Sequence, residues 1–258
     1  MKKYSLAFVF ALLIPTSATF AEGFGNIFFV TMESAADGTS HIEWIGSSMI
    51  WLLILLSVVN VSLISTLWTR NKRRRILPEQ FASEMEKLLD GGEHLEVVEM
   101  SAAEASDYSK ILSAALRQAH AGHSSMLRAA EQTGEEVAVK RFRTLETLNV
   151  LGQVSPMIGL FGTVYGMIVA FQAIARTGGT ADPVTLASGI GTALVTTFWG
   201  LLIAIPALTA YAAIRNNVDA ATLESVRRVE TAIGRFATPH ARANSGVGQR
   251  PLHAESTT

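Results

Sequence analysis

A row of hydroxyl side chains runs along one apolar stretch in the second half of the chain. Its members recur at steps of three and four residues, as Thr185, Ser188, Thr192 and Thr196, with Thr197 beside them. On a helix, residues at these spacings share one face. Single hydroxyls often bond back to carbonyls of their own helix, which would explain one or two of them. A whole row predicts a polar or hydrated lumen that could serve as an ion pathway.

The preceding apolar stretch carries small residues at similar spacings. The steps are four, three, four and four residues, from Ser155 through Gly159, Gly162, Gly166 and Ala170. In lipid, such stripes let helix backbones approach closely. We therefore predict that these glycines serve helix packing, together with Gly200 of the next stretch. Thr163 adds a hydroxyl to the same helix and is a further candidate for lining the ion pathway.

Neither stretch contains an ionisable side chain. No Asp, Glu, Lys, Arg or His lies between Glu146 and Arg176, or between Asp182 and Arg215. Proton and ion relays normally need such a group at membrane depth. If these stretches conduct protons, the titrating carboxylate must come from a partner helix, and the hydroxyls with trapped water would solvate it.

Residues for other kinds of chemistry are missing or unpatterned. The chain has no cysteine, which excludes disulfides, thiolate metal sites and a cysteine nucleophile. His120 and His123 lie three residues apart, but without a carboxylate pattern they favour an ordinary solvated helix face over a metal site. The net charge of -1 argues against nucleic-acid binding. We expect no catalytic residues, no cofactor and no metal.

The composition points to a membrane. Of the 258 residues, 49% are hydrophobic and 17% are charged, whereas soluble domains average about 25% charged. Three stretches without charge are long enough to cross a bilayer, at 47–69, 147–175 and 185–214. The connection at 176–184 is short and rich in glycine, so the last two spans form an antiparallel hairpin. We predict an all-α membrane protein whose three transmembrane helices extend into a cytoplasmic helical domain.

Charges beside the spans predict the orientation. Residues 1–21 resemble a signal peptide, with a basic start, a short apolar core and a cleavage site after Ala21. An uncleaved anchor is the alternative. Residues 22–46 carry acidic side chains but no Lys or Arg, whereas Arg70 to Arg75 are strongly basic. Basic flanks stay in the cytoplasm, so we expect a periplasmic N-terminus and a cytoplasmic C-terminus in a multi-pass inner-membrane protein.

The remaining segments are polar. Residues 70–146 form the predicted cytoplasmic domain, with one helix from Pro78 to Gly91 and a second pattern through Ile111 to Leu116. A third helix is predicted to begin near Glu135 and to continue into the membrane. Residues 215–258 are predicted to be a cytoplasmic helix, ending near Phe236, and a disordered tail.

The two spans of the hairpin resemble the ExbB/TolQ/MotA proton-channel family. The first signature reads Pro156-Met157-Ile158-Gly159-Leu160-Phe161-Gly162-Thr163-Val164-Tyr165-Gly166-Met167, followed by Phe171. The second reads Gly189-Ile190-Gly191-Thr192-Ala193-Leu194-Val195-Thr196-Thr197, followed by Gly200-Leu201 and Ala204-Ile205-Pro206-Ala207. The likeness is strong over about 140–215 and is closest to ExbB, the biopolymer transport protein.

The resemblance implies a subunit of a proton-driven motor in the bacterial inner membrane. It implies a homo-oligomer, a pentamer, around the single spans of an ExbD-like partner whose Asp carries protons, and a TonB-like protein that the complex energises for outer-membrane transport. By position, Thr163 and Thr197 match the family's lumen-facing threonines. Thr192 falls where many ExbB proteins have glutamate, which puts a relay role for this position in doubt. We expect Pro206 to kink or loosen the third span, since it removes a backbone hydrogen bond.

Two alternatives remain open from the sequence. A TolQ-like or MotA-like subunit would use the same hairpin for envelope integrity or motility, although MotA-type proteins have four spans. A membrane scaffold that conducts nothing would use the polar stripe for packing alone. The sequence also leaves open whether protons or sodium ions move.

Overall fold

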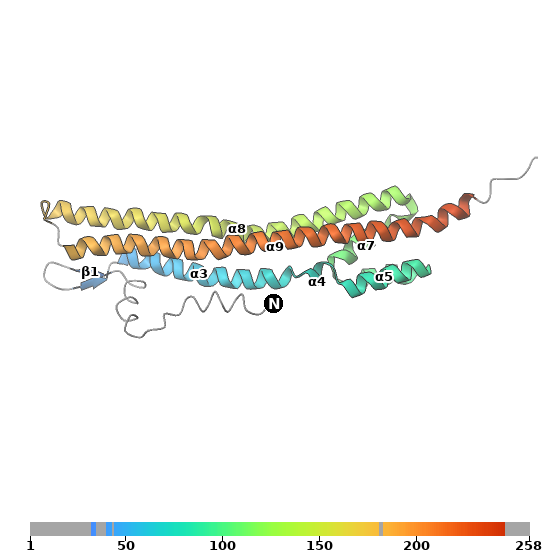
Figure 1. The fold of residues 1–258 in the computed structure, drawn as a ribbon, viewed down its shortest axis with the longest axis horizontal. Coiled ribbons are helices and arrows are strands. Elements are labelled where there is room, and N and C mark those ends of the chain that lie inside the picture. The colour runs from blue at the N-terminus through green and yellow to red at the C-terminus, as the bar shows by residue number, and fades with distance from the viewer. Residues whose placement is uncertain (1–31, 35–39, 43, 181–182, 246–258) are drawn as a thin grey trace, which may run out of the picture. The chain divides into compact units, whose positions relative to one another are not determined.

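The structure, a computed structural model, describes residues 32–34, 40–42, 44–180 and 183–245. The expected signal peptide at 1–21 and the end of the expected tail, from residue 246 on, lie outside the described residues. Figure 1 labels the elements along the chain.

Helices make up nearly all of the described chain. It begins with a short antiparallel pair of strands, β1 (Met32–Ser34) and β2 (Ser40–Ile42), in which Glu33 lies opposite His41. The helices that follow are α3 (Trp44–Arg70), α4 (Arg73–Ile76), α5 (Glu79–Gly91), α6 (His94–Ala103), α7 (Asp107–Arg117), the 3₁₀ turn η1 (Ala119–Ala121), α8 (His123–Arg176) and α9 (Pro183–Ser245).

Three of these helices, α3, α8 and α9, are long and apolar enough to cross a membrane. The predicted all-α fold with three spans and long continuing helices is therefore confirmed, with the small strand pair as an addition. Helix α8 begins at His123, well before the start near Glu135 that the sequence predicts. Gly134 interrupts the helical pattern in the sequence, but a Cβ there would lie 2.5 Å from Val226 Cγ2. The glycine thus permits a close helix contact and does not end the helix.

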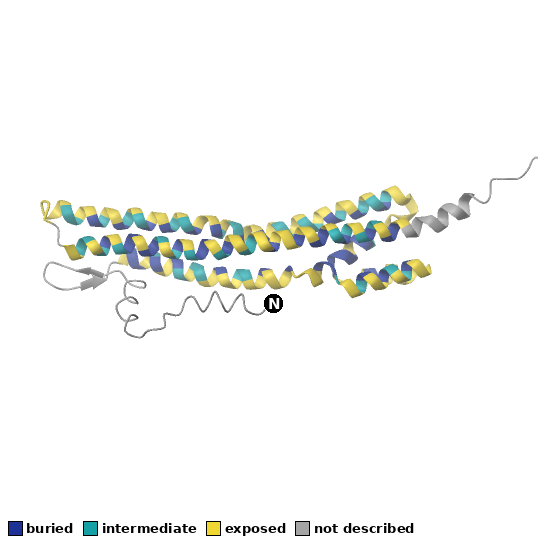
Figure 2. Cartoon of the chain, viewed as in Figure 1, coloured by how far each residue is buried: buried dark blue, intermediate teal, exposed yellow. Residues whose placement is uncertain are grey.

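The chain divides into two compact units. We call residues 1–65 with 147–210 the membrane unit, and residues 66–146 with 211–258 the polar unit. Helices α8 and α9 each contribute residues to both. In both units, buried and exposed residues alternate along the helices (Figure 2). Each unit is described by itself below.

Large apolar side chains of the membrane unit point outward. Trp51, Leu55, Met157, Leu160 and Leu194 are among those that are exposed in the single chain. Exposed apolar side chains in such number are unfavourable in water and suit contact with lipid or with other membrane helices. The small residues, in contrast, lie inside, between the helices.

The polar unit has an apolar core of its own. Met85 of α5, Tyr108 and Leu112 of α7, and Val229 of α9 are among its buried members. Helix α5 ends where the sequence predicts, because Gly92 adopts φ 79°, a left-handed conformation that ends helices, and its N–H bonds to the carbonyls of the last turn. Ser106 caps α7 by accepting a hydrogen bond from Ser109 N at 3.2 Å.

The loop after α8 turns the chain back at once. Gly178 and Gly179 have φ angles of 65° and 99°, which side chains rarely allow. The N–H of Gly179 donates to the carbonyl of Ile174 at 3.1 Å and so satisfies one of the free carbonyls at the end of α8. Within the membrane unit, α8 and α9 therefore run antiparallel.

Candidate functional site

The contact between α8 and α9 is a seam of small residues. A Cβ added to Gly159 would lie 2.9 Å from the carbonyl oxygen of Thr196 and 3.1 Å from Thr197 Cα. A Cβ on Gly166 would lie 2.5 Å from the carbonyl oxygen of Gly189. These positions face backbone atoms, which cannot move aside. Only glycine fits at this separation of the two helices.

The glycines of α9 lie equally close to atoms of α8. A Cβ on Gly200 would lie 2.8 Å from the carbonyl oxygen of Ser155, and one on Gly189 would lie 2.9 Å from Ala170 Cβ. Gly162 faces the side chain of Thr196. The two helices thus fit together over several turns with almost no side-chain volume between them. Close backbone contact of this kind is how helices associate in lipid, where hydrophobic burial gives little driving force.

Thr197 lies at this seam, Thr163 directly follows the seam residue Gly162, and both stay partly accessible. Both are half-buried in the single chain. Thr197 Oγ1 lies 3.4 Å from the carbonyl oxygen of Gly159 on α8 and 3.3 Å from that of Ala193 on its own helix. Thr163 Oγ1 donates to the carbonyl of Leu160 at 2.6 Å. Each oxygen keeps lone pairs that can accept a hydrogen bond from a water molecule or a protonated acid.

The other predicted lining residues are less accessible. Thr192 and Thr196 are only 2% and 0% exposed, and they donate to the carbonyls of Ser188 and Thr192, each one turn earlier. The sequence predicts these two hydroxyls on an open polar face, whereas both are buried within the single chain, Thr196 against Gly162 of α8. The reason is that Gly162 leaves room for Thr196. Ser188 is half-buried.

Pro206 lies inside α9, which continues through it as a helix. A polar residue that the sequence analysis did not single out is nearby: Asn60 of α3 is buried, and its Nδ2 donates to the carbonyl of Ile203 at 3.0 Å. The sequence could have indicated Asn60, because it is a single amide in the middle of a span whose other residues are apolar or carry only small hydroxyls.

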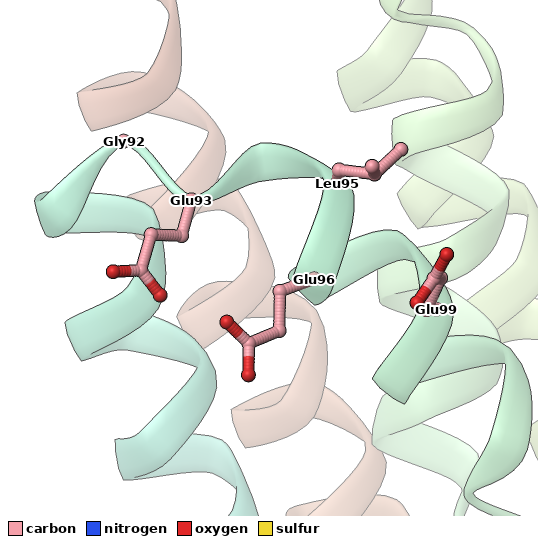
Figure 3. Close-up of a pocket in the computed structure, with 5 residues that line it drawn as sticks. All are labelled: Gly92, Glu93, Leu95, Glu96 and Glu99. Carbon is pink, nitrogen blue, oxygen red and sulfur yellow. The ribbon is translucent and has the colours of Figure 1, made fainter.

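Carboxylates gather in the polar unit instead. A cavity of about 530 Å³ is lined by Gly92, Glu93, Leu95, Glu96 and Glu99, and Figure 3 shows the carboxylates of Glu93 and Glu96 on the same side of the backbone. A hydrogen bond with the Glu93 side chain, and then repulsion from its charge, raises the pKa of Glu96. All of these side chains are exposed to solvent, so the cluster is an acidic surface feature. Among the described residues, no group of His, Cys, Asp and Glu has the arrangement of a metal site.

A second cavity of the polar unit, of about 390 Å³, is lined by Arg215 and by the aromatic side chains of Phe142 and Tyr211. The guanidinium of Arg215 lies 5.2 Å from the ring centre of Phe142 and 5.8 Å from that of Tyr211. Its Nη1 donates to the hydroxyl of Tyr211 at 2.7 Å. Aromatic faces attract cations at such distances, which anchors this arginine at the point where α9 leaves the membrane unit.

These features define a class of protein. Three apolar helices, two of them closely packed through glycine and bordered by hydroxyls, with no Asp, Glu, Lys, Arg or His at 147–175 or 185–214, are typical of a membrane subunit that builds a pathway or a scaffold.

Comparison with known proteins supports the family resemblance. The profile of the MotA/TolQ/ExbB proton channel family matches residues 103–226. This match and the relatives below support the ExbB-like resemblance that the two signatures predict.

Several curated relatives are similar to part of the chain. The biopolymer transport protein exbB1 of Vibrio cholerae is 48% identical over 64 residues, which are 25% of this chain and 28% of that protein. A putative biopolymer transport protein ExbB homolog of Methanothermobacter thermautotrophicus is 32% identical over 148 residues, or 57% of this chain and 52% of that protein. The Tol-Pal system protein TolQ of Pseudomonas aeruginosa is 41% identical over 95 residues, or 37% of this chain and 36% of that protein.

The chain thus spans about half or less of the length of these relatives. Among solved structures, that of C. jejuni MotAB matches 79% of this chain and 88% of its own, with 17% identity and a TM-score of 0.39.

Proposed function

We propose that this chain is an ExbB-like channel or stator subunit of a proton-driven motor in the bacterial inner membrane. With an ExbD-like partner it would energise a TonB-like protein and so drive transport across the outer membrane. The names of its relatives, which include biopolymer transport proteins, support this choice within the family. The chain would catalyse no covalent reaction and would need no cofactor.

One observation carries the proposal. The half-buried residues Thr163 and Thr197 lie at or beside a tightly closed helix seam, in two spans that hold no Asp, Glu, Lys, Arg or His. Such a surface can solvate a carboxylate in either protonation state but cannot carry a proton along by itself. It is therefore suited to a polar pathway whose titrating group belongs to another polypeptide.

The need for a titrating group from another polypeptide indicates what kind of partner to expect. A single-span, ExbD-like protein would place the carboxylate of an Asp beside Thr163 and Thr197. A carboxylate alone at the bilayer centre costs about 2.5–3.5 kcal/mol on insertion scales, and the hydroxyls with bound water would offset part of that. One hairpin cannot enclose a guest helix, so several copies must surround it, and a pentamer is the number that the family implies.

The remaining site residues would act from behind this surface. Thr192 and Thr196, buried against α8, would hold the seam in place, and Ser188 would extend the polar edge toward the start of α9. Pro206 would let α9 bend. In the proposed orientation the N-terminus is periplasmic and the polar unit and C-terminus are cytoplasmic, because the basic residues Arg70 to Arg75 follow the first span.

A TolQ-like role is the alternative that a specific observation favours, because TolQ of Pseudomonas aeruginosa is 41% identical over 95 residues. Purification of the complex from native membranes, with identification of the bound single-span protein, separates an ExbD-like from a TolR-like partner. A scaffold that conducts nothing would bind the same partner without proton flux.

The test is proton flux through the purified complex in liposomes, followed with an internal pH dye. Thr163→Ala combined with Thr197→Val removes both hydroxyls, and we expect flux to fall to the level of liposomes without protein while the partner still co-purifies. Thr209→Val is the matched control, since Thr209 is exposed and bonds only to Ile205 of its own helix. Undiminished flux in the double variant, or equal loss in the control, would refute the proposed pathway.

A further inference from the structure

Asn60 joins the first span to the third. It lies in the middle of α3 with 1% of its surface exposed, and its Nδ2 donates to the carbonyl of Ile203 at 3.0 Å. Both residues belong to the membrane unit. The bond fixes the plane of the amide, because turning it over would aim Oδ1 at a carbonyl oxygen, and two acceptors repel each other.

The other end of the amide is unpaired. Asn60 Oδ1 is buried and has no hydrogen-bond partner among the described residues. A buried acceptor without a donor destabilises a fold, because it has lost its hydrogen bond to water and gained none in return. No donor of a second subunit or of lipid can reach it, because the single chain already covers Asn60 almost completely.

A second acceptor has lost its usual donor in the same turn of α9. Pro206 is inside α9 and has no N–H, so the carbonyl of Leu202, four residues earlier, cannot receive its usual helical hydrogen bond. Leu202 directly precedes Ile203, whose carbonyl accepts the hydrogen bond from Asn60. The turn of α9 that contacts Asn60 therefore also contains the carbonyl that the proline deprives of its donor.

We propose that this contact is a binding site for one buried water molecule, which donates one hydrogen to Asn60 Oδ1 and the other to the carbonyl of Leu202. Water supplies two donors of small size, which is what the site lacks, and buried waters typically make two to four such bonds to polar groups. The water would join α3 to α9 near the proline and replace the backbone hydrogen bond that the proline removes. The site does not depend on proton conduction.

Radiolytic footprinting in ¹⁸O-labelled water tests the site on the full-length chain in detergent. Brief irradiation generates hydroxyl radicals from bound as well as bulk water, and these oxidise only side chains that lie close by. Ile203 is 0% exposed, so ¹⁸O appears on it only if water lies inside the protein. Leu148, also 0% exposed and in the same unit, serves as the dry reference within each sample.

We expect several-fold more label on Ile203 than on Leu148 in the unaltered chain. Asn60→Leu removes one acceptor, and Pro206→Ala returns a donor to the carbonyl of Leu202, so each should lower the label on Ile203 to the level of Leu148. The matched controls are Ser62→Ala, an exposed position of the same helix, and Pro156→Ala, a proline inside α8, and both should leave the label on Ile203 unchanged.

Pro206→Ala keeps the experiment decisive if Asn60→Leu does not fold, because it removes a helix-disrupting residue. Label on Ile203 no higher than on Leu148 in the unaltered chain would overturn the proposal. So would label that persists in Asn60→Leu, or label that persists in Pro206→Ala, because the water would then not bind both acceptors.

Discussion

Arg141 Nε donates to Asp107 Oδ2 at 2.5 Å in the polar unit. The carboxylate is 3% exposed and also pairs with Lys110 at 3.2 Å. The same guanidinium donates to the carbonyl of Arg70 and to Asn71 Oδ1, the latter at 2.9 Å. One buried ion pair therefore ties the start of α7, the middle of α8 and the residues just after α3 to one another.

Asp107→Ala should strongly destabilise the polar unit. It leaves a largely buried arginine without its carboxylate, and removal of one partner of a buried ion pair costs about 3–5 kcal/mol. The control is Glu79→Ala, whose pair with Arg73 at 3.6 Å is exposed on both sides and should contribute less than about 1 kcal/mol. Thermal unfolding of the full-length chain, followed by circular dichroism, measures both. Equal shifts of the midpoint would show that burial does not govern these pairs.

The sequence predicts three long apolar helices because charge is costly in lipid. Its uncharged intervals lie within α3, α8 and α9, the helices that are apolar enough to cross a membrane, and Gly91 with Gly92 marks the end of α5. Helix α6 was not predicted, since it has only ten residues and a weakly amphipathic pattern. It is held by contacts with α5 and α7, the helices before and after it in the chain, and such packing leaves little trace in a single sequence.

The candidate site, too, could be predicted only in part, because the sequence does not show which helices contact each other. Helical spacing correctly groups Thr192 and Thr196 on one face of α9, but spacing cannot tell whether that face meets a lumen or another helix. The answer depends on Gly162 of α8, which leaves the space that the Thr196 side chain fills. The buried contact of Asn60 with Ile203 joins residues that are 143 positions apart, so local patterns could not indicate it.

The close contact at the glycine seam allows us to predict how adding a single methyl group changes stability. Gly166→Ala places a Cβ 2.5 Å from the carbonyl oxygen of Gly189 and 2.8 Å from Ala193 N. Backbone atoms cannot rotate away, so the helices must separate, and overpacking of this kind costs about 1–3 kcal/mol. Gly191→Ala is the control on the facing helix, because a Cβ there meets nothing within 4 Å. It should stabilise α9 by about 0.5–1 kcal/mol through helix propensity.

The thermal midpoints of the two alanine variants should therefore move in opposite directions, which a scan of the purified chain in detergent can show. We also expect Gly166→Ala to lower the yield of intact complex with the proposed partner, since the proposed pathway surface lies beside this seam. If Gly166→Ala were as stable as the unaltered chain, the separation of α8 and α9 in the structure would be too small.

Tyr108 offers a test of a buried hydroxyl in the core of the polar unit. Its ring is fully buried and lies edge-on to Phe81, with 6.4 Å between ring centres. Its hydroxyl has no hydrogen-bond partner among the described residues. Burial, followed by repulsion from Glu86, raises the pKa of Tyr108, and Arg228 opposes this only in part. The phenol therefore stays neutral throughout the physiological pH range.

Tyr108→Phe should thus be neutral or stabilising by up to about 1 kcal/mol, because it removes a buried polar atom and keeps the ring. Tyr108→Ala should cost about 3–5 kcal/mol, as is usual when a buried aromatic side chain is lost. Denaturant titration of the full-length chain measures both changes in the free energy of unfolding. A loss of more than about 1 kcal/mol in Tyr108→Phe would mean that the hydroxyl is hydrogen-bonded after all, and the core would then include a bound water at this position.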